Sequence, residues 1–171
     1  MPSSIKQIKL VVLDVDGVLT DGRITLNSRG QESKSFHARD GLGIRAAIGA
    51  GLQVGVLSSR CSTVVNCRMS ELGVDLIIQG ERNKKLGMTK IIRRAGVNGD
   101  QTAFLGDDLL DLPAMQVCGY PMAVADAAEE VKALAEYVTK VPGGYGAVRD
   151  AMEHILKSQG LWDQVVSKYK G

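Results

Sequence analysis

Two aspartates separated by one residue follow an apolar, β-branched run near the start of the chain. The run covers residues 8–13, and Asp14, Asp16 and Gly17 come directly after it. Side chains two residues apart in an extended strand point to the same side, so we expect the two carboxylates to lie close together. Close carboxylates repel each other unless a cation lies between them or one keeps its proton. This stretch therefore indicates either acid–base chemistry beside a cation or an ordinary Asp-Gly turn.

Further polar groups stand where other predicted strands end or where a helix begins. These are Ser58 after residues 52–57, Asp107, Asp108 and Asp111 after residues 102–105, and Lys84 near the start of residues 83–95. In an open parallel sheet the carboxyl ends of the strands share one edge, where ligands bind. Carboxylates suit a hard cation, and a lysine with a hydroxyl suits a phosphoryl group. Taken alone, Lys84 would be a solvated surface lysine, and Ser58 a turn residue or helix cap.

Strand-like and helix-like segments alternate along the chain, which predicts a parallel sheet with helices on both faces. The fold class is therefore α/β, with a doubly wound, Rossmann-like sheet in a single domain spanning residues 1–171. A β-hairpin is expected at about residues 22–36, and a tail at about residues 160–171. We expect strands at 8–13, 52–57, 75–78, 102–105, 121–124 and 137–138, and helices at 40–48 (with Asp40 as N-cap), 62–72, 83–95, about 112–117, 127–135 and 147–156.

Composition excludes several classes of function. The chain has 171 residues, a net charge of +2 and 4% aromatic residues. So small a charge and so few aromatics predict no nucleic-acid partner. Because no stretch has transmembrane length, no membrane association is predicted. Three cysteines without C-x-x-C spacing, Cys61, Cys67 and Cys118, favour a cytoplasmic location.

In their order along the chain, these groups resemble the four motifs of the haloacid dehalogenase (HAD) phosphatase superfamily. The closer resemblance is to capless phosphatases that act on 3-deoxy-D-manno-octulosonate 8-phosphate and on related sialic-acid-like sugar phosphates. His37 and Ser59 stand where those proteins usually carry Asn and Gly. The matching stretches are Asp14–Gly22, Phe36–Gly41, Ser58–Arg60, Lys84, Gly106–Pro113 and Gly143–Ala147.

The resemblance implies a two-step hydrolysis that depends on Mg²⁺. Asp14 would be the nucleophile that forms an aspartyl-phosphate, and Asp16 the acid and then the base. The ion would be held by the Asp14 side chain, the Asp16 backbone carbonyl and the Asp107 side chain. The Mg²⁺ ion would reduce the repulsion between the Asp14 carboxylate and the substrate phosphate, which are both anions.

Other residues would bind or support. Ser58 and Lys84 would bind the phosphoryl oxygens, and Asp108 and Asp111 would support the metal or Lys84.

Two arginines are candidates to read the carboxylate of a sugar acid, because a guanidinium pairs with a carboxylate in bidentate fashion. Arg60 and Arg68 are eight residues apart and can share one face of a helix that begins near Ser62. Arg68 stands where the resembling phosphatases carry an arginine for this carboxylate, which could serve a neighbouring subunit. As isolated residues, both would be solvated arginines on a helix surface.

The chain leaves room for a hairpin but for no lid domain, although excluding water strengthens electrostatic catalysis. The resembling enzymes are capless tetramers, so a homotetramer is expected in which the hairpin or the tail closes a neighbouring site. The tail could equally pack on its own domain. Residues 143–146 are either a loop near the substrate or a turn before the last helix.

The leading function is hydrolysis of 3-deoxy-D-manno-octulosonate 8-phosphate in lipopolysaccharide sugar biosynthesis. A second enzymatic reading changes the substrate to a nine-carbon keto-sugar 9-phosphate. Outside enzymes, a phospho-accepting receiver module also uses acids, a hydroxyl and a lysine, but its acceptor aspartate follows a central strand and its acidic pair follows the first. An inactive binding subunit is the remaining alternative. Turnover of a simple aryl phosphate with Mg²⁺ would separate the enzymes from the last two.

Overall fold

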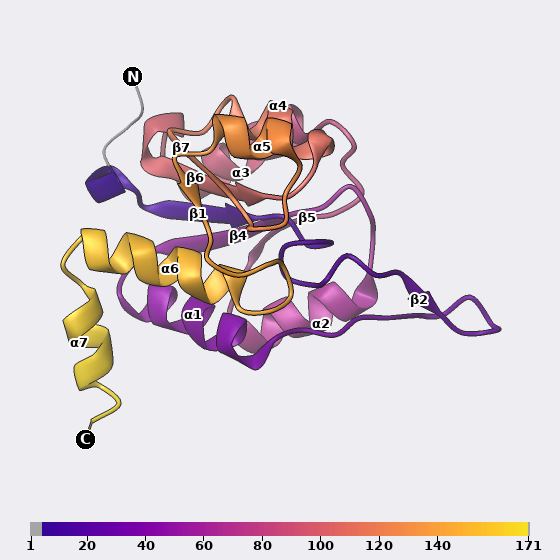
Figure 1. Cartoon of the computed structure of the whole chain (residues 1–171), viewed down its shortest axis with the longest axis horizontal. Coiled ribbons are helices and arrows are strands. Elements are labelled where there is room, and N and C mark those ends of the chain that lie inside the picture. The colour runs from indigo at the N-terminus through magenta and orange to yellow at the C-terminus, as the bar shows by residue number, and fades with distance from the viewer. Residues whose placement is uncertain (1–4, 171) are drawn as a thin grey trace.

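A six-stranded parallel sheet forms the centre of the protein, whose computed structural model describes residues 5–170 (Figure 1). The strand order is β5-β4-β1-β6-β7-β8, and every neighbouring pair is parallel. This confirms the predicted doubly wound α/β fold. The strands are β1 (Leu10–Leu13), β4 (Gln53–Leu57), β5 (Leu76–Ile78), β6 (Thr102–Gly106), β7 (Tyr120–Ala123) and β8 (Tyr137–Val138).

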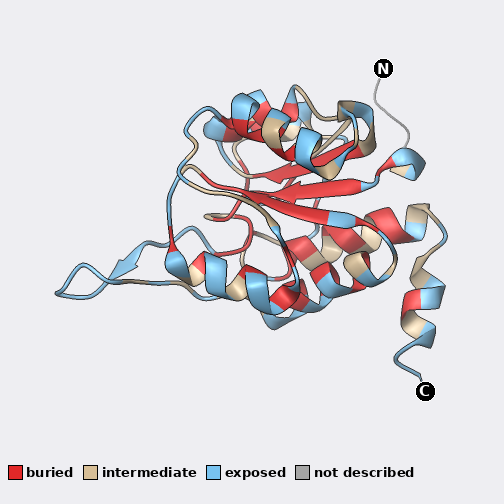
Figure 2. Cartoon of the chain, turned by 180° about the vertical axis from the view of Figure 1, so that it is seen from behind, coloured by how far each residue is buried: buried red, intermediate tan, exposed pale blue. Residues whose placement is uncertain are grey.

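Helices cover both faces of this sheet, with α1, α2 and α6 on one side and α3, α4 and α5 on the other (Figure 1). All four residues of β1 are buried, as expected for a strand covered on both faces. Figure 2 shows the buried strands between the two helical layers. The helices are α1 (Ala38–Gly49), α2 (Thr63–Leu72), α3 (Lys84–Ala95), α4 (Leu112–Met115), α5 (Glu129–Leu134), α6 (Ala147–Ser158) and α7 (Trp162–Ser167), with 3-10 turns η1 (Ile5–Gln7), η2 (Gly99–Gln101) and η3 (Leu109–Asp111). None of the helices within residues 5–170 combines the length and the apolarity needed to cross a membrane.

Two predicted helix boundaries are wrong. His37, not Asp40, caps α1, and its Nδ1 accepts a hydrogen bond from the Arg39 N–H. Asp40 lies inside the first turn, where its buried carboxylate accepts a 2.8 Å hydrogen bond from the Arg149 N–H at the start of α6. The Asp40 side chain, which the local pattern assigns to the N-cap, is instead used for packing between α1 and α6. The helix α4 begins at Leu112, directly after η3, but it ends at Met115, two residues before the predicted end at Val117.

The hairpin and the tail leave the body of the protein at different places (Figure 1). Strands β2 (Thr25–Leu26) and β3 (Glu32–Ser33) pair antiparallel over two residues each, which confirms the predicted hairpin. In the tail, the ring of Trp162 lies 5.0 Å from the Arg149 guanidinium of α6, and Val165 is buried. The tail therefore packs on its own chain. Gly171 of the predicted tail and residues 1–4 of the predicted domain lie outside the described residues.

Two glycines allow the loop before α6 to pack against the loop that follows β1. The Gly144 N–H donates to the Val18 carbonyl at 3.0 Å. A Cβ atom on Gly143 would lie 1.6 Å from the Gly17 carbonyl oxygen, so a side chain there would force the two loops apart. The predicted glycine loop therefore supports the backbone that carries Asp16, in addition to leading into α6.

Candidate active site

Polar side chains from several strand ends line one cavity of about 270 Å³ at the carboxyl edge of the sheet. The parallel register places the end of β1 between the ends of β4 and β6, with Leu13 opposite both Val56 and Leu105. All of the predicted site residues except Arg68 line this cavity: Asp14, Asp16, Ser58, Arg60, Lys84, Asp107, Asp108 and Asp111. Most of these residues follow parallel strands whose carboxyl ends share one edge of the sheet, and this is why they lie together.

Lys84 lies deep in this cavity, with 2% of the residue exposed. Its Nζ donates to Asp14 Oδ1 at 2.6 Å, to Asp111 Oδ1 at 2.8 Å and to the Leu57 carbonyl at 3.1 Å. Burial alone would lower the pKa of Lys84, but the charges of the two aspartates raise it, so the group stays an ammonium. The interpretation of Lys84 as a solvated surface lysine is therefore wrong.

Three carboxylates crowd around this one ammonium. Oxygens of Asp14, Asp107 and Asp111 all lie within 4.8 Å of one another. Burial and the charge of Asp111 raise the pKa of Asp14 to about 6, against the opposing effect of Lys84. Burial and the charges of Asp111 and Asp14 raise the pKa of Asp107 to about 8. The raised pKa values show that the ionised carboxylates lack a neutralising charge. A hard divalent cation such as Mg²⁺, which prefers oxygen ligands, would supply that charge.

Asp111 is already engaged, which leaves Asp14 and Asp107 as the side chains that could hold a cation. Oδ2 of Asp111 accepts from the Asp107 N–H at 2.9 Å, while Oδ1 accepts from Lys84. Asp108 caps η3 by accepting from the Leu109 N–H at 2.8 Å. A Cβ atom on Gly17 would lie 2.0 Å from Asp107 Oδ2, so glycine at this position is what gives the carboxylate its space.

Ser58 and Arg60 follow β4 on the other side of β1. The buried Ser58 Oγ accepts from the Arg60 N–H at 3.2 Å, so its own hydroxyl hydrogen is free to donate to a ligand. The Arg60 guanidinium contacts Glu32 at 2.7 Å and Asp16 Oδ2 at 3.5 Å. With 48% of its side chain exposed, Arg60 still presents donors to the cavity.

The expectation that Arg60 and Arg68 share a helix face is wrong, because α2 begins at Thr63 and Arg60 precedes it. Arg68 pairs with Glu71 at 2.8 Å. Its guanidinium lies over α1, where a Cβ atom on Gly41 would come within 2.4 Å of the Arg68 Nη2. Arg68 therefore lies against α1 and does not line the cavity of its own chain.

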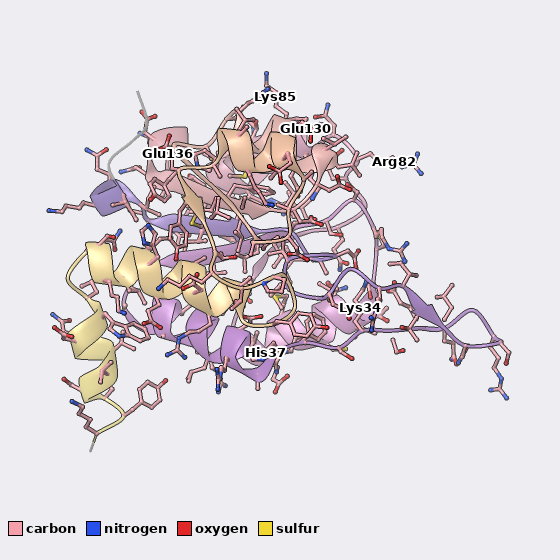
Figure 3. All side chains as sticks on the ribbon, in the orientation of Figure 1. Lys34, His37, Arg82, Lys85, Glu130 and Glu136 are labelled. Atoms are coloured by element: carbon pink, nitrogen blue, oxygen red, sulfur yellow. The ribbon has the colours of Figure 1, made fainter. Side chains whose placement is uncertain are left out.

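Sequence reasoning missed Lys34 and Glu32 of the hairpin. Nζ of Lys34 lies 2.5 Å from Asp16 Oδ1 and 3.2 Å from Glu32 Oε1. Figure 3 shows Lys34 at the base of the hairpin. Side chains two residues apart in a strand point to the same side, so the spacing of Glu32 and Lys34 could have predicted that both face the same part of the molecule.

Comparison with known proteins gives a consistent match. Residues 54–152 match the model of the haloacid dehalogenase-like hydrolases. The 3-deoxy-D-manno-octulosonate 8-phosphate phosphatase of Haemophilus influenzae is 44% identical over 160 residues, covering 94% of this chain and 89% of that protein. Its counterpart in Escherichia coli K12 is 38% identical, covering 93% and 85%. The crystal structure of the Moraxella catarrhalis phosphatase with magnesium, phosphate and KDO superposes with a TM-score of 0.94 at 38% identity, covering 97% and 95%.

Replacing Lys84 should destabilise the protein far more than replacing its neighbour. Lys84→Met would leave Asp14 and Asp111 without their buried partner, so we expect a loss of about 3–5 kcal/mol in the free energy of unfolding. Lys85→Met removes the same charge from an exposed position and should change it by less than about 0.5 kcal/mol. Urea unfolding at pH 8 without divalent cations measures both, and similar values for the two variants would contradict this account of the site.

Proposed function

The chain belongs to the haloacid dehalogenase-like hydrolases, and from that premise we propose that it is a Mg²⁺-dependent phosphomonoesterase acting on 3-deoxy-D-manno-octulosonate 8-phosphate. The products are the free sugar acid and phosphate, in lipopolysaccharide sugar biosynthesis. The cavity at the end of β1 carries the proposal, because it combines Asp14 and Asp16 with a buried lysine and a hydroxyl. The names of the relatives, which match nearly the whole chain, support the choice of substrate.

Asp14 performs the first step as nucleophile. Its carboxylate oxygen forms a bond to phosphorus while the bond between phosphorus and the sugar oxygen breaks. Asp16 gives its proton to the departing sugar oxygen. In the second step Asp16 takes a proton from water, whose oxygen attacks the aspartyl-phosphate, so that phosphate leaves and the Asp14 carboxylate returns.

The transferring phosphoryl group is held by Ser58 and Lys84. The Ser58 hydroxyl lines the cavity and can donate to a phosphoryl oxygen. The three N–H groups of the Lys84 ammonium are bonded to Asp14, Asp111 and the Leu57 carbonyl, so this residue acts on the phosphoryl group through its positive charge. Positioning and electrostatics supply most of the catalysis in phosphoryl transfer. Mg²⁺ held by Asp14, the Asp16 carbonyl and Asp107 would neutralise the charge between nucleophile and phosphate. Asp111 and Asp108 keep Lys84 and the loop of Asp107 in place.

We also propose that the enzyme is a cytoplasmic homotetramer. Ile24 and Leu26 on the hairpin are 44% and 57% exposed, and apolar residues at such positions favour a partner surface. The free and exposed Cys61 and Cys67 fit a reducing compartment.

Substituting the nucleophile tests the chemistry. Asp14→Asn should reduce phosphate release from 3-deoxy-D-manno-octulosonate 8-phosphate by several powers of ten, because an amide is a poor nucleophile and a weaker ligand for Mg²⁺. Asp75→Asn makes the same change at an exposed position before β5 and should leave activity unchanged. A folded Asp14→Asn protein with near-wild-type turnover would refute the covalent mechanism, and a wild-type preference for a nine-carbon keto-sugar 9-phosphate would refute the substrate.

The oligomeric state can be measured directly. Size-exclusion chromatography with light scattering should give the mass of a tetramer at working concentrations. A fully active monomer would contradict the proposal that neighbouring chains complete the site.

Arg68 gives a sharper test of a shared site. Arg68→Ala should lower kcat/KM on the sugar acid by a factor that corresponds to about 1.5–3 kcal/mol, the range for a hydrogen bond to a charged group. Hydrolysis of a small aryl phosphate, which has no carboxylate, should be nearly unchanged. Because Arg68 lies outside its own chain's cavity, we propose that it reads the substrate carboxylate in a neighbouring site, while Arg60 does so within its own chain.

Mixing two defective variants tests this arrangement. Subunits with Arg68→Ala keep Asp14, and subunits with Asp14→Asn supply Arg68, so tetramers reassembled from both should exceed the summed activities of the separate variants on the sugar acid. Activity equal to that sum, or an equal loss on both substrates in Arg68→Ala alone, would show that Arg68 has no such role.

A further inference from the structure

The hairpin places a buried lysine against the candidate acid, Asp16. Lys34 follows β3, and its side chain is 1% exposed although most residues of the hairpin are exposed. Its Nζ lies 2.5 Å from Asp16 Oδ1 and 3.2 Å from Glu32 Oε1. A lysine this deeply buried needs ionic partners, since an unpaired buried charge is strongly unfavourable.

Arg60 completes the same cluster from the other side of the site. Its guanidinium contacts Asp16 Oδ2 at 3.5 Å and Glu32 Oε1 at 2.7 Å. Two acids and two bases therefore alternate around the cluster. The two oxygens of Asp16 each face a different cation, one from the hairpin and one from the loop after β4.

Glu32 makes this arrangement possible. Without it, two cations would face the single carboxylate of Asp16. Oε1 of Glu32 lies 3.2 Å from Lys34 Nζ and 2.7 Å from an Arg60 nitrogen, so one carboxylate oxygen holds both cations beside Asp16. Contacts from Ser62, Arg60 and Lys34 outweigh the opposing effect of burial and lower the pKa of Glu32 to about 2, so it stays ionised.

Lys34 itself is placed to act on Asp16 and not on the substrate. It does not line the cavity that holds Asp14, Asp16 and Lys84. Asp16 precedes Gly17, whose φ of +90° marks a sharp turn in the backbone, so the Asp16 carboxylate depends on side-chain contacts for its direction. Proton transfer requires that carboxylate to lie within hydrogen-bond reach of the leaving oxygen.

We propose that Lys34 is a positioning residue, which holds the Asp16 carboxylate in the direction needed to protonate the leaving group, with Glu32 as its anchor. This inference rests on the proposed function, in which Asp16 is the general acid. The hairpin is then part of the catalytic apparatus of its own chain, through Lys34. Its strands pair over only two residues each, too few to fix its place, so the ion pairs at its base determine where it lies.

Leaving-group dependence provides the test. With Mg²⁺ present, kcat/KM is measured on phenyl phosphate and on p-nitrophenyl phosphate, neither of which carries a carboxylate or a sugar. Phenolate is the poorer leaving group and needs the proton from Asp16 more. Lys34→Met should therefore lower kcat/KM on phenyl phosphate about tenfold or more beyond its effect on p-nitrophenyl phosphate. Since kcat/KM covers only the steps up to departure of the alcohol, the later hydrolysis of the aspartyl-phosphate does not affect it.

Two further variants separate positioning from structure. Arg29→Met removes the same charge from the exposed tip of the same hairpin and should leave both values unchanged. Lys34→Arg keeps the charge and the donors and should restore most of the wild-type ratio. Urea unfolding of each variant measures any loss of stability, and Lys34→Gln takes the place of Lys34→Met if that protein does not fold.

The outcomes distinguish this inference from the proposed function. Equal losses on the two aryl phosphates, or a gain on phenyl phosphate, would refute a positioning role while leaving the phosphatase intact. A wild-type protein that releases phosphate from neither aryl phosphate nor the sugar phosphate would refute the proposed function, and the role of Lys34 with it.

Discussion

The structure depends above all on the ion pairs of one buried lysine. Lys84 begins α3, yet its ammonium is bonded to Asp14 at the end of β1 and to Asp111 after β6. These contacts join segments that are 70 and 27 residues apart in the chain. They form at the end of β1, which lies between β4 and β6 in the sheet. The strands that follow β1 are added first on its β4 side and then on its β6 side, so the strand order reverses at β1. In open α/β sheets, ligands bind where the strand order reverses. Here the same ion pairs that connect β1, α3 and the segment after β6 also form the candidate site.

Two clusters of charge meet at the carboxyl edge, and their balances differ. Around Lys84, three carboxylates face one ammonium, and the pKa values of Asp14 and Asp107 are raised as a result. When ionised, that cluster has two unmatched negative charges, the charge that one Mg²⁺ ion would neutralise. Around Lys34, two acids alternate with two bases, so this cluster has no excess of acids that a metal ion would neutralise. The first is thus suited to recruit a cation and a phosphate, and the second to fix a geometry.

Local pattern predicted most of this arrangement because each cavity residue follows a strand or begins a helix. Asp14, Ser58 and Asp107 could be placed together from the parallel sheet alone. The failures share a cause, which is that long-range packing decides them. Asp40 is taken from the cap of α1 by a backbone group 109 residues away. Arg60 proved to lie before α2, and nothing local to Lys34 indicated that the hairpin turns back onto Asp16.

In the proposed tetramer, the base of the hairpin would connect contacts between subunits with the catalytic acid. Ile24 and Leu26 are exposed on the hairpin, whereas the Lys34 side chain is buried at its base, so one short ribbon carries both the proposed partner surface and a contact with Asp16. A force applied at the outer part of such a ribbon is resisted mainly by the ion pairs, since the two-residue strands contribute little stiffness of their own. In the proposed tetramer, contacts between hairpins would therefore act on Asp16 through Lys34. A capless enzyme could in this way make proton transfer depend on its neighbours without any lid that covers the substrate.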